Sequence, residues 1–199
     1  MASSAEKSSI STSSFFPLRT VNDVCKWFAH ECDEKEPDLV LLSIVIGFIE
    51  NCMTNIKDVN FSSHLGQVAK TEPQEEDVTN ANLKIEPQVD WHVIETLYKK
   101  FESILQSYCD PNLLSHAREE DAKSSDVRIL IKHVADIIWN TLSKAQYKDR
   151  PHLQSIYSYL TGNKLDCFGV AFAVVAACQM LQVKGIHLAL SEDHACKFD

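Results

Sequence analysis

The chain has 199 residues, of which 45% are apolar and 24% are charged, and its formal net charge is −9. This composition is typical of a globular protein and excludes a wholly disordered chain, a collagen or a fibre. A negative field repels phosphate backbones, so the charge also argues against direct binding of DNA or RNA and favours basic partners.

Residues 1–14 are rich in serine and predict a disordered tail, which precedes an N-terminal helical domain over residues 15–108. Thr20 and Asp23 have the spacing of a capping box, which starts a helix by satisfying its first amide groups. Pro37 blocks continuation of that helix. One face of the helix is apolar at i, i+3, i+4 and i+7 and is expected to be buried: Val21, Val24, Cys25 and Phe28.

A second helix is expected over residues 39–53, where Asp38 can cap the first turn. This segment is apolar nearly all round, which predicts a place at the centre of a core. Residues 57–88 lose the helical period and contain an acidic run, so we expect a long loop or irregular hairpin there. A third helix follows over residues 91–108, in which apolar side chains recur every three or four positions.

Residues 109–124 break the helical pattern and predict a linker between two domains. Ser124 or Ser125 can cap a fourth helix just after it. A fifth helix, from about Pro151, is expected to end with Gly162 immediately beyond its last turn.

Residues 125–199 form the second predicted domain. Its last helix, over residues 167–181, is almost wholly apolar and should be the buried centre of the domain. Lys184 and Gly185 turn the chain, and residues 186–190 alternate in polarity like a strand with one buried face. Many helices followed by a strand give the expected fold class, which is α+β and predominantly helical.

The seven cysteines lie mostly in apolar segments, and the serine-rich start lacks the apolar core of a signal peptide. Reduced thiols in the cytosol or nucleus are therefore expected. The longest apolar run, residues 39–49, is too short to cross a bilayer, so no membrane partner is expected. Four residues include suitable zinc ligands, but at a spacing that matches no established zinc site: Cys167, Asp193, His194 and Cys196. No metal or other cofactor is expected.

A cysteine at a helix start, followed by a strand and a histidine, is the sharpest local feature. Cys167 would lie in the first turn of its helix, where unpaired amide groups favour the thiolate, and His194 could accept its proton. Such a pair is the core of thiol acyl-transfer catalysis. The order of the elements is similar to that of the transglutaminase or papain-like core.

Two features argue against catalysis at this pair. Cys196 stands where an aromatic residue usually follows the His-Ala dipeptide, and the strand that should carry an orienting Asp lies beyond the sequence. We therefore expect a relic pair, Cys167 and His194, and no enzyme. The alternative is an active Cys–His acyltransferase or thiol protease.

Four stretches of the sequence are long and specific: FPLR at 16–19, EPDLVLLS at 36–43, the segment 136–150 with DIIWN, and 161–195 with HLALSEDHA. Together they resemble the menin family over about residues 15–195. The resemblance implies a nuclear scaffold with a long β-hairpin in the N-terminal helical domain. It also implies an inactive, incomplete transglutaminase-like domain over residues 125–199, truncated before the family's palm of TPR-like repeats.

The resemblance also implies partners. Menins bind the N-terminal peptide of MLL-type histone methyltransferases and JunD-type transcription factors in one deep pocket, as part of transcriptional and chromatin regulation. Carried over by motif, the wall of that pocket would consist of Phe168, Leu190, Ser191, Asp193, His194 and Ala195. Menins hold a small residue where Phe168 stands, so its ring could narrow or fill a subpocket.

Menins continue for several hundred residues beyond this point. We therefore expect half of the pocket to be missing and peptide affinity to be reduced. The remaining alternative is a fragment that does not fold alone and has no binding role.

Overall fold

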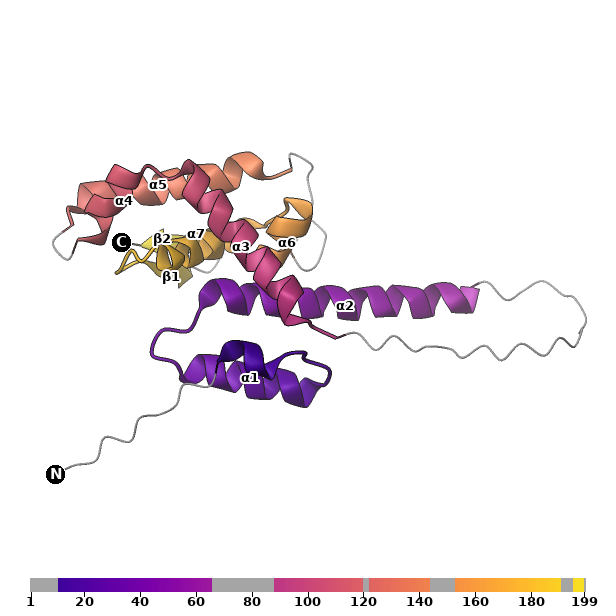
Figure 1. Cartoon of the computed structure of the whole chain (residues 1–199). Coiled ribbons are helices and arrows are strands. Elements are labelled where there is room, and N and C mark those ends of the chain that lie inside the picture. Colours follow the sequence, from indigo (N-terminus) through magenta and orange to yellow (C-terminus); the bar gives the residue numbers. More distant parts are fainter. Residues whose placement is uncertain (1–10, 66–87, 120–121, 144–152, 191–194, 199) are drawn as a thin grey trace, which may run out of the picture.

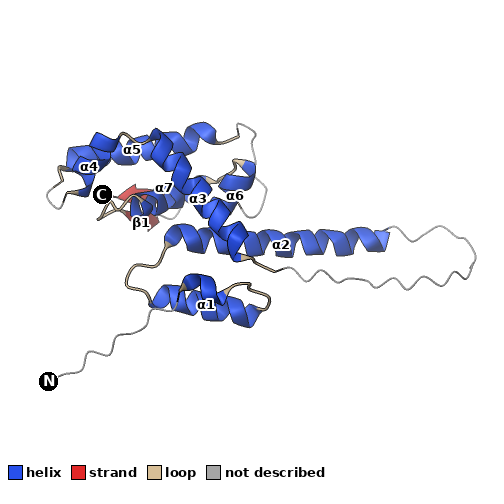
Figure 2. Cartoon of the chain, viewed as in Figure 1, coloured by secondary structure: helices blue, strands red, loops and turns tan. Residues whose placement is uncertain are grey.

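The computed structural model describes residues 11–65, 88–119, 122–143, 153–190 and 195–198 (Figure 1). Its helices are, in chain order, a short 3-10 helix η1 (Thr12–Phe15), α1 (Val21–Asp33), α2 (Leu39–Leu65), α3 (Trp91–Tyr108), α4 (Pro111–Arg118), α5 (Ser124–Thr141), α6 (Ile156–Gly162) and α7 (Cys167–Met180). Two strands, β1 (His187–Leu190) and β2 (Ala195–Phe198), pair antiparallel. Helices dominate the described residues, as predicted (Figure 2).

Helix α7 is the centre of the core. It lies between α5 and α2 in Figure 1 and also contacts both strands. Residues 173–178 are all buried, and three of these six are alanines, which let neighbouring helices approach closely. This confirms the prediction of a buried central helix. No single described helix is long and apolar enough to span a membrane; α6 and α7 meet that test only together, across a bend of 101°.

The start of α2 is held by two other helices. Asp38 caps its first turn, because the carboxylate accepts the amide of Leu41 at 2.9 Å. The hydroxyl of Tyr98 on α3 donates to the same carboxylate at 2.7 Å. Gln179 on α7 accepts the amide of Leu39 at 3.0 Å. The predicted cap is therefore confirmed, and it also links α2 to α3 and α7.

The N-terminal helix α1 begins as predicted but buries a different face. The capping box of residues 20–23 is present. However, Val21 is 80% exposed and Phe28 is 42% exposed, whereas Trp27 is fully buried. Trp27 packs edge-on against Phe16, at a ring separation of 6.1 Å. The predicted face was wrong because the largest side chain decides which stripe is buried, and Trp27 lies outside the stripe that the spacing selected.

Three segments predicted to lack helix contain one. Residues 12–14 of the predicted tail belong to η1, and α2 continues to Leu65 through the start of the predicted 57–88 loop. Residues 66–87 lie outside the described residues. The predicted linker 109–124 contains α4, where Asp110 caps the helix and Pro111 takes its first position. That Asp-Pro pair is a start signal which the interpretation as a linker overlooked. The domain boundary itself stays a prediction.

The ends of two later helices also differ from expectation. Lys123, rather than a serine, takes the cap position of α5, and its side chain makes no capping bond. Helix α6 begins at Ile156, where Ser155 accepts the amide of Ser158. It ends at Gly162, followed by Asn163 in the left-handed conformation. Asparagine tolerates that conformation better than most residues, so it replaces the glycine expected there.

Candidate functional site

The structure places only part of the predicted pocket wall. Leu190 ends β1 and Ala195 begins β2, and the register sets these two residues opposite each other. Ser191, Asp193 and His194 lie outside the described residues. Cys167 is the first residue of α7 and is exposed. The proposed Cys167–His194 pair therefore stays a prediction.

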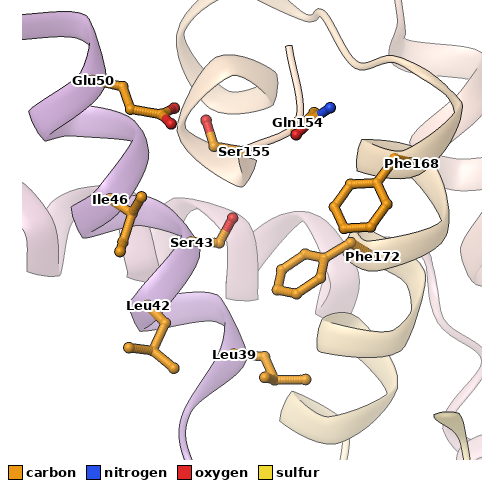
Figure 3. Close-up of a pocket in the computed structure, with 9 residues that line it drawn as sticks. All are labelled: Leu39, Leu42, Ser43, Ile46, Glu50, Gln154, Ser155, Phe168 and Phe172. Carbon is orange, nitrogen blue, oxygen red and sulfur yellow. The ribbon is translucent and has the colours of Figure 1, made fainter. Parts of the chain in front are cut away.

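Phe168, the remaining predicted residue, lines a cavity of about 280 Å³ (Figure 3). The cavity lies between α2, α7 and the segment that leads into α6. Phe168 and Phe172 form the α7 side, one turn apart, with nearly parallel rings 6.2 Å apart. The apolar residues on the α2 side are Leu39, Leu42 and Ile46. We call this cavity the α2–α7 pocket.

Close packing of α2 against α6 fixes one wall of the α2–α7 pocket. A Cβ on Gly47 would collide with the side chains of Ser155 and Tyr157, so only glycine allows this approach. The hydroxyl of Ser43 accepts the amide of Ile156 at 2.9 Å. The pocket is thus set by contacts within the chain before any ligand binds.

The opposite wall depends on the start of α7. Asp166 caps α7 by accepting the amide of Gly169 at 2.7 Å. A Cβ on Gly169 would crowd the carbonyl oxygen of Leu153, so the segment before α6 packs directly on this turn. Phe168 is held between these contacts and faces the pocket (Figure 3).

Four polar residues complete the lining: Ser43, Glu50, Gln154 and Ser155. The hydroxyl of Ser43 accepts the backbone amide of Ile156, and the hydroxyl of Ser155 accepts that of Ser158. Glu50 supplies a carboxylate on the α2 side, and Gln154 supplies an amide on the opposite side (Figure 3). Apolar walls with an acidic edge suit a ligand that presents apolar and basic groups.

Among the described residues, thiol and metal-ligand groups do not gather at the α2–α7 pocket. No histidine or cysteine is among the described residues that line the α2–α7 pocket. Burial raises the pKa of the Cys52 and Cys109 thiols, which favours their protonated, unreactive form. Within the described part of the chain, no group of three or more His, Cys, Asp or Glu side chains could hold a metal ion.

Residues 9–198 match the sequence model of the menin family. The chain belongs to the menin family. It is similar to a menin whose crystal structure is described as revealing the binding site for the Mixed Lineage Leukemia (MLL) protein, with a TM-score of 0.63 and 36% identity. That match covers 92% of this chain and 33% of the solved menin, so the chain spans about a third of that relative's length. Membership of the menin family supports a scaffold, which acts by binding proteins rather than by catalysis.

The α2 side of the pocket in this menin-family chain was missed by sequence reasoning. Four apolar side chains of α2 are buried, as expected of a helix that is apolar nearly all round: Val40, Leu41, Ile44 and Val45. Ile46 stays 37% exposed and faces the pocket.

Proposed function

We propose that this menin-family chain is a nuclear scaffold in transcriptional and chromatin regulation. It binds peptides of MLL-type histone methyltransferases and of JunD-type transcription factors, and it requires no cofactor. The α2–α7 pocket carries the proposal, because Phe168 lines it and its apolar walls have Glu50 at one edge. The solved menin, described as revealing the binding site for MLL, supports the choice of partner.

The chemistry of the proposed ligand fits the pocket. The MLL-type motif is basic and carries phenylalanine and proline. At about 280 Å³ the pocket lies near the lower end of the range for small-ligand sites, so it suits one or two anchoring side chains. Basic groups beside the anchor would lie near Glu50, in a chain whose net charge is −9.

The residues predicted between β1 and β2 complete the proposed site. Ser191, Asp193 and His194 would add a second polar edge, and Leu190 and Ala195 would add apolar surface. In this proposal α7, β1 and β2 are the start of an inactive transglutaminase-like core. Because the chain spans about a third of the solved menin, we expect micromolar rather than nanomolar affinity.

A peptide titration tests the proposal. A labelled basic peptide containing Phe and Pro is titrated with the purified chain at low and moderate salt, and the same peptide with Phe replaced by Ala is the ligand control. Saturable binding that weakens with salt and with loss of the Phe is expected. Phe168→Ala should weaken binding, whereas Ile129→Ala, at an exposed position of α5, should not. Absence of binding by protein with a cooperative thermal transition would contradict the proposal.

A further inference from the structure

A second and larger groove lies on the other side of Phe172. Its volume is about 810 Å³, and it is bounded by the C-terminal part of α7, residues 182–188 and the start of α2. We call it the basic groove. It shares Phe172 and Leu39 with the α2–α7 pocket, but neither Phe168 nor Glu50 lines it.

The basic groove combines apolar lining with a mainly basic set of charges. Its apolar residues include Phe172, Val175, Val183 and Leu188. Arg118 and Lys184 carry positive charges along it, whereas Glu36 carries the one negative charge among the described lining residues. This balance is opposite to that of the whole chain, which has 28 acidic and 19 basic residues.

The walls of the basic groove are fixed by hydrogen bonds. Arg118 on α4 donates its Nε–H to the carbonyl oxygen of Leu181 at 2.7 Å, which anchors the guanidinium at the end of α7. Gln179 donates to the carbonyl oxygen of Pro37 at 2.8 Å and accepts the amide of Leu39. Gly185, at φ +80°, makes the turn beside Lys184 in a conformation that side chains disfavour.

The start of α2 does not supply the positive character of the groove. The amide of Leu39 is taken by Gln179, and the amide of Leu41 is taken by Asp38. The cations are therefore the side chains of Arg118 and Lys184, and His187 adds a ring that can donate a hydrogen bond.

We propose that the basic groove binds an acidic peptide segment of a partner protein. An apolar side chain of the segment packs on Phe172 and Val175, and carboxylates beside it pair with Arg118 and Lys184. A volume of about 810 Å³ accommodates several residues. Guanidinium and ammonium groups select carboxylates, and the apolar lining provides an anchor that a free small anion would not use. The ligand is opposite in charge to the peptide proposed for the α2–α7 pocket, so one chain can hold two different partners.

Binding of a synthetic peptide tests this proposal. The probe is a short labelled peptide with two leucines flanked by glutamates, and the ligand control carries lysines in place of the glutamates. The glutamate peptide should bind saturably and the lysine peptide should not compete. Lys184→Glu should weaken binding by about threefold or more, and Lys184→Gln by less, since neutralisation removes an attraction without adding a repulsion.

Two control variants make the test specific. Lys132→Glu produces the same change of charge at an exposed position of α5 outside the groove and should leave the affinity unchanged. Ile46→Ala, at a residue that lines the α2–α7 pocket but not the groove, should weaken binding of the basic, Phe-containing peptide but not of the glutamate peptide, so this proposal can fail while the proposed function stands. Equal losses of affinity for the glutamate peptide in Lys184→Glu and Lys132→Glu would overturn the proposal. Absence of saturable binding of that peptide would overturn it as well.

Discussion

Gln179 of α7 takes the place of a capping residue for Leu39, the first residue of α2. Its Oε1 accepts the Leu39 amide at 3.0 Å, and its Nε2 donates to the carbonyl oxygen of Pro37 at 2.8 Å. The two residues are 140 positions apart in the sequence. One side-chain amide thus joins the central helix to the start of α2, at the edge of the basic groove.

Replacing Gln179 by leucine should destabilise the fold by about 1–3 kcal/mol, because two partly buried backbone groups lose their partner. Urea unfolding followed by circular dichroism measures the change. The control is Gln106→Leu, which removes only an exposed bond to Glu102 within α3. Similar losses of unfolding free energy in both variants would show that the Gln179 contacts contribute little to stability.

The bond between Thr12 and Glu31 fastens η1 to α1. The Thr12 hydroxyl donates to a Glu31 carboxylate oxygen at 2.7 Å, and Glu31 is only 4% exposed. Thr12→Val should cost about 1–3 kcal/mol, since a buried carboxylate loses its donor, and Thr12→Asp should cost more because it adds a like charge. Ser14→Val, at an exposed neighbouring position, is the control. Equal unfolding midpoints for Thr12→Val and Ser14→Val would refute this account.

The capping box of α1 makes part of the stability depend on pH. Hydrogen bonds from Thr20 and from the backbone amides of Arg19 and Thr20 lower the pKa of Asp23 from its ordinary value of 3.8. Because the pKa of Asp23 is lower in the folded state than in the unfolded state, the ionised carboxylate stabilises the fold at pH values above its unfolded-state pKa. This stabilisation is lost as the pH falls through the folded-state pKa.

The advantage of the parent chain over Asp23→Asn should therefore be largest at pH 6 and shrink at pH 3. Thermal unfolding midpoints at the two pH values measure it. Asp136→Asn, at an exposed position of α5, should show no comparable change. A constant difference between the parent and Asp23→Asn at both pH values would contradict the assignment.

If Cys167 and His194 are a relic pair, Cys167 should react with iodoacetamide at the slow rate of an ordinary exposed thiol. Cys25 and Cys32 are exposed on α1 and serve as references within the same chain. The His194→Ala variant should leave the rate at Cys167 unchanged, as read by mass spectrometry of the labelled peptides. Selective labelling of Cys167 that disappears in this variant would favour the acyltransferase alternative.

Periodicity and capping signals predicted most of the helices. The 3.6-residue period of α3 and α5, the apolar run of α7 and the cap at Asp38 follow from local chemistry, which a single sequence displays. The buried face of α1 could not be predicted in this way, because it depends on Phe16 and on contacts made by η1.

The pocket walls were harder to predict than the helices. The menin-like motif identified Phe168, but Leu42 and Ile46 face the same cavity only because α2 packs against α6 and α7. Such a cavity is a property of how helices cross. Its one local sign is Gly47, a glycine within the apolar run of residues 39–49.

A variant at Gly47 tests whether the close packing of α2 against α6 forms the pocket. Gly47→Ala places a methyl group against the side chains of Ser155 and Tyr157, so α2 and α6 must separate, at a cost of about 1–3 kcal/mol. The separation of α2 and α6 should also lower the affinity for the basic, Phe-containing peptide. Gly162→Ala is the matched control, because its Cβ would meet only the flexible Lys164 side chain at 3.5 Å or more. If Gly47→Ala is as stable and binds as well as Gly162→Ala, the close approach of α2 and α6 does not shape the site.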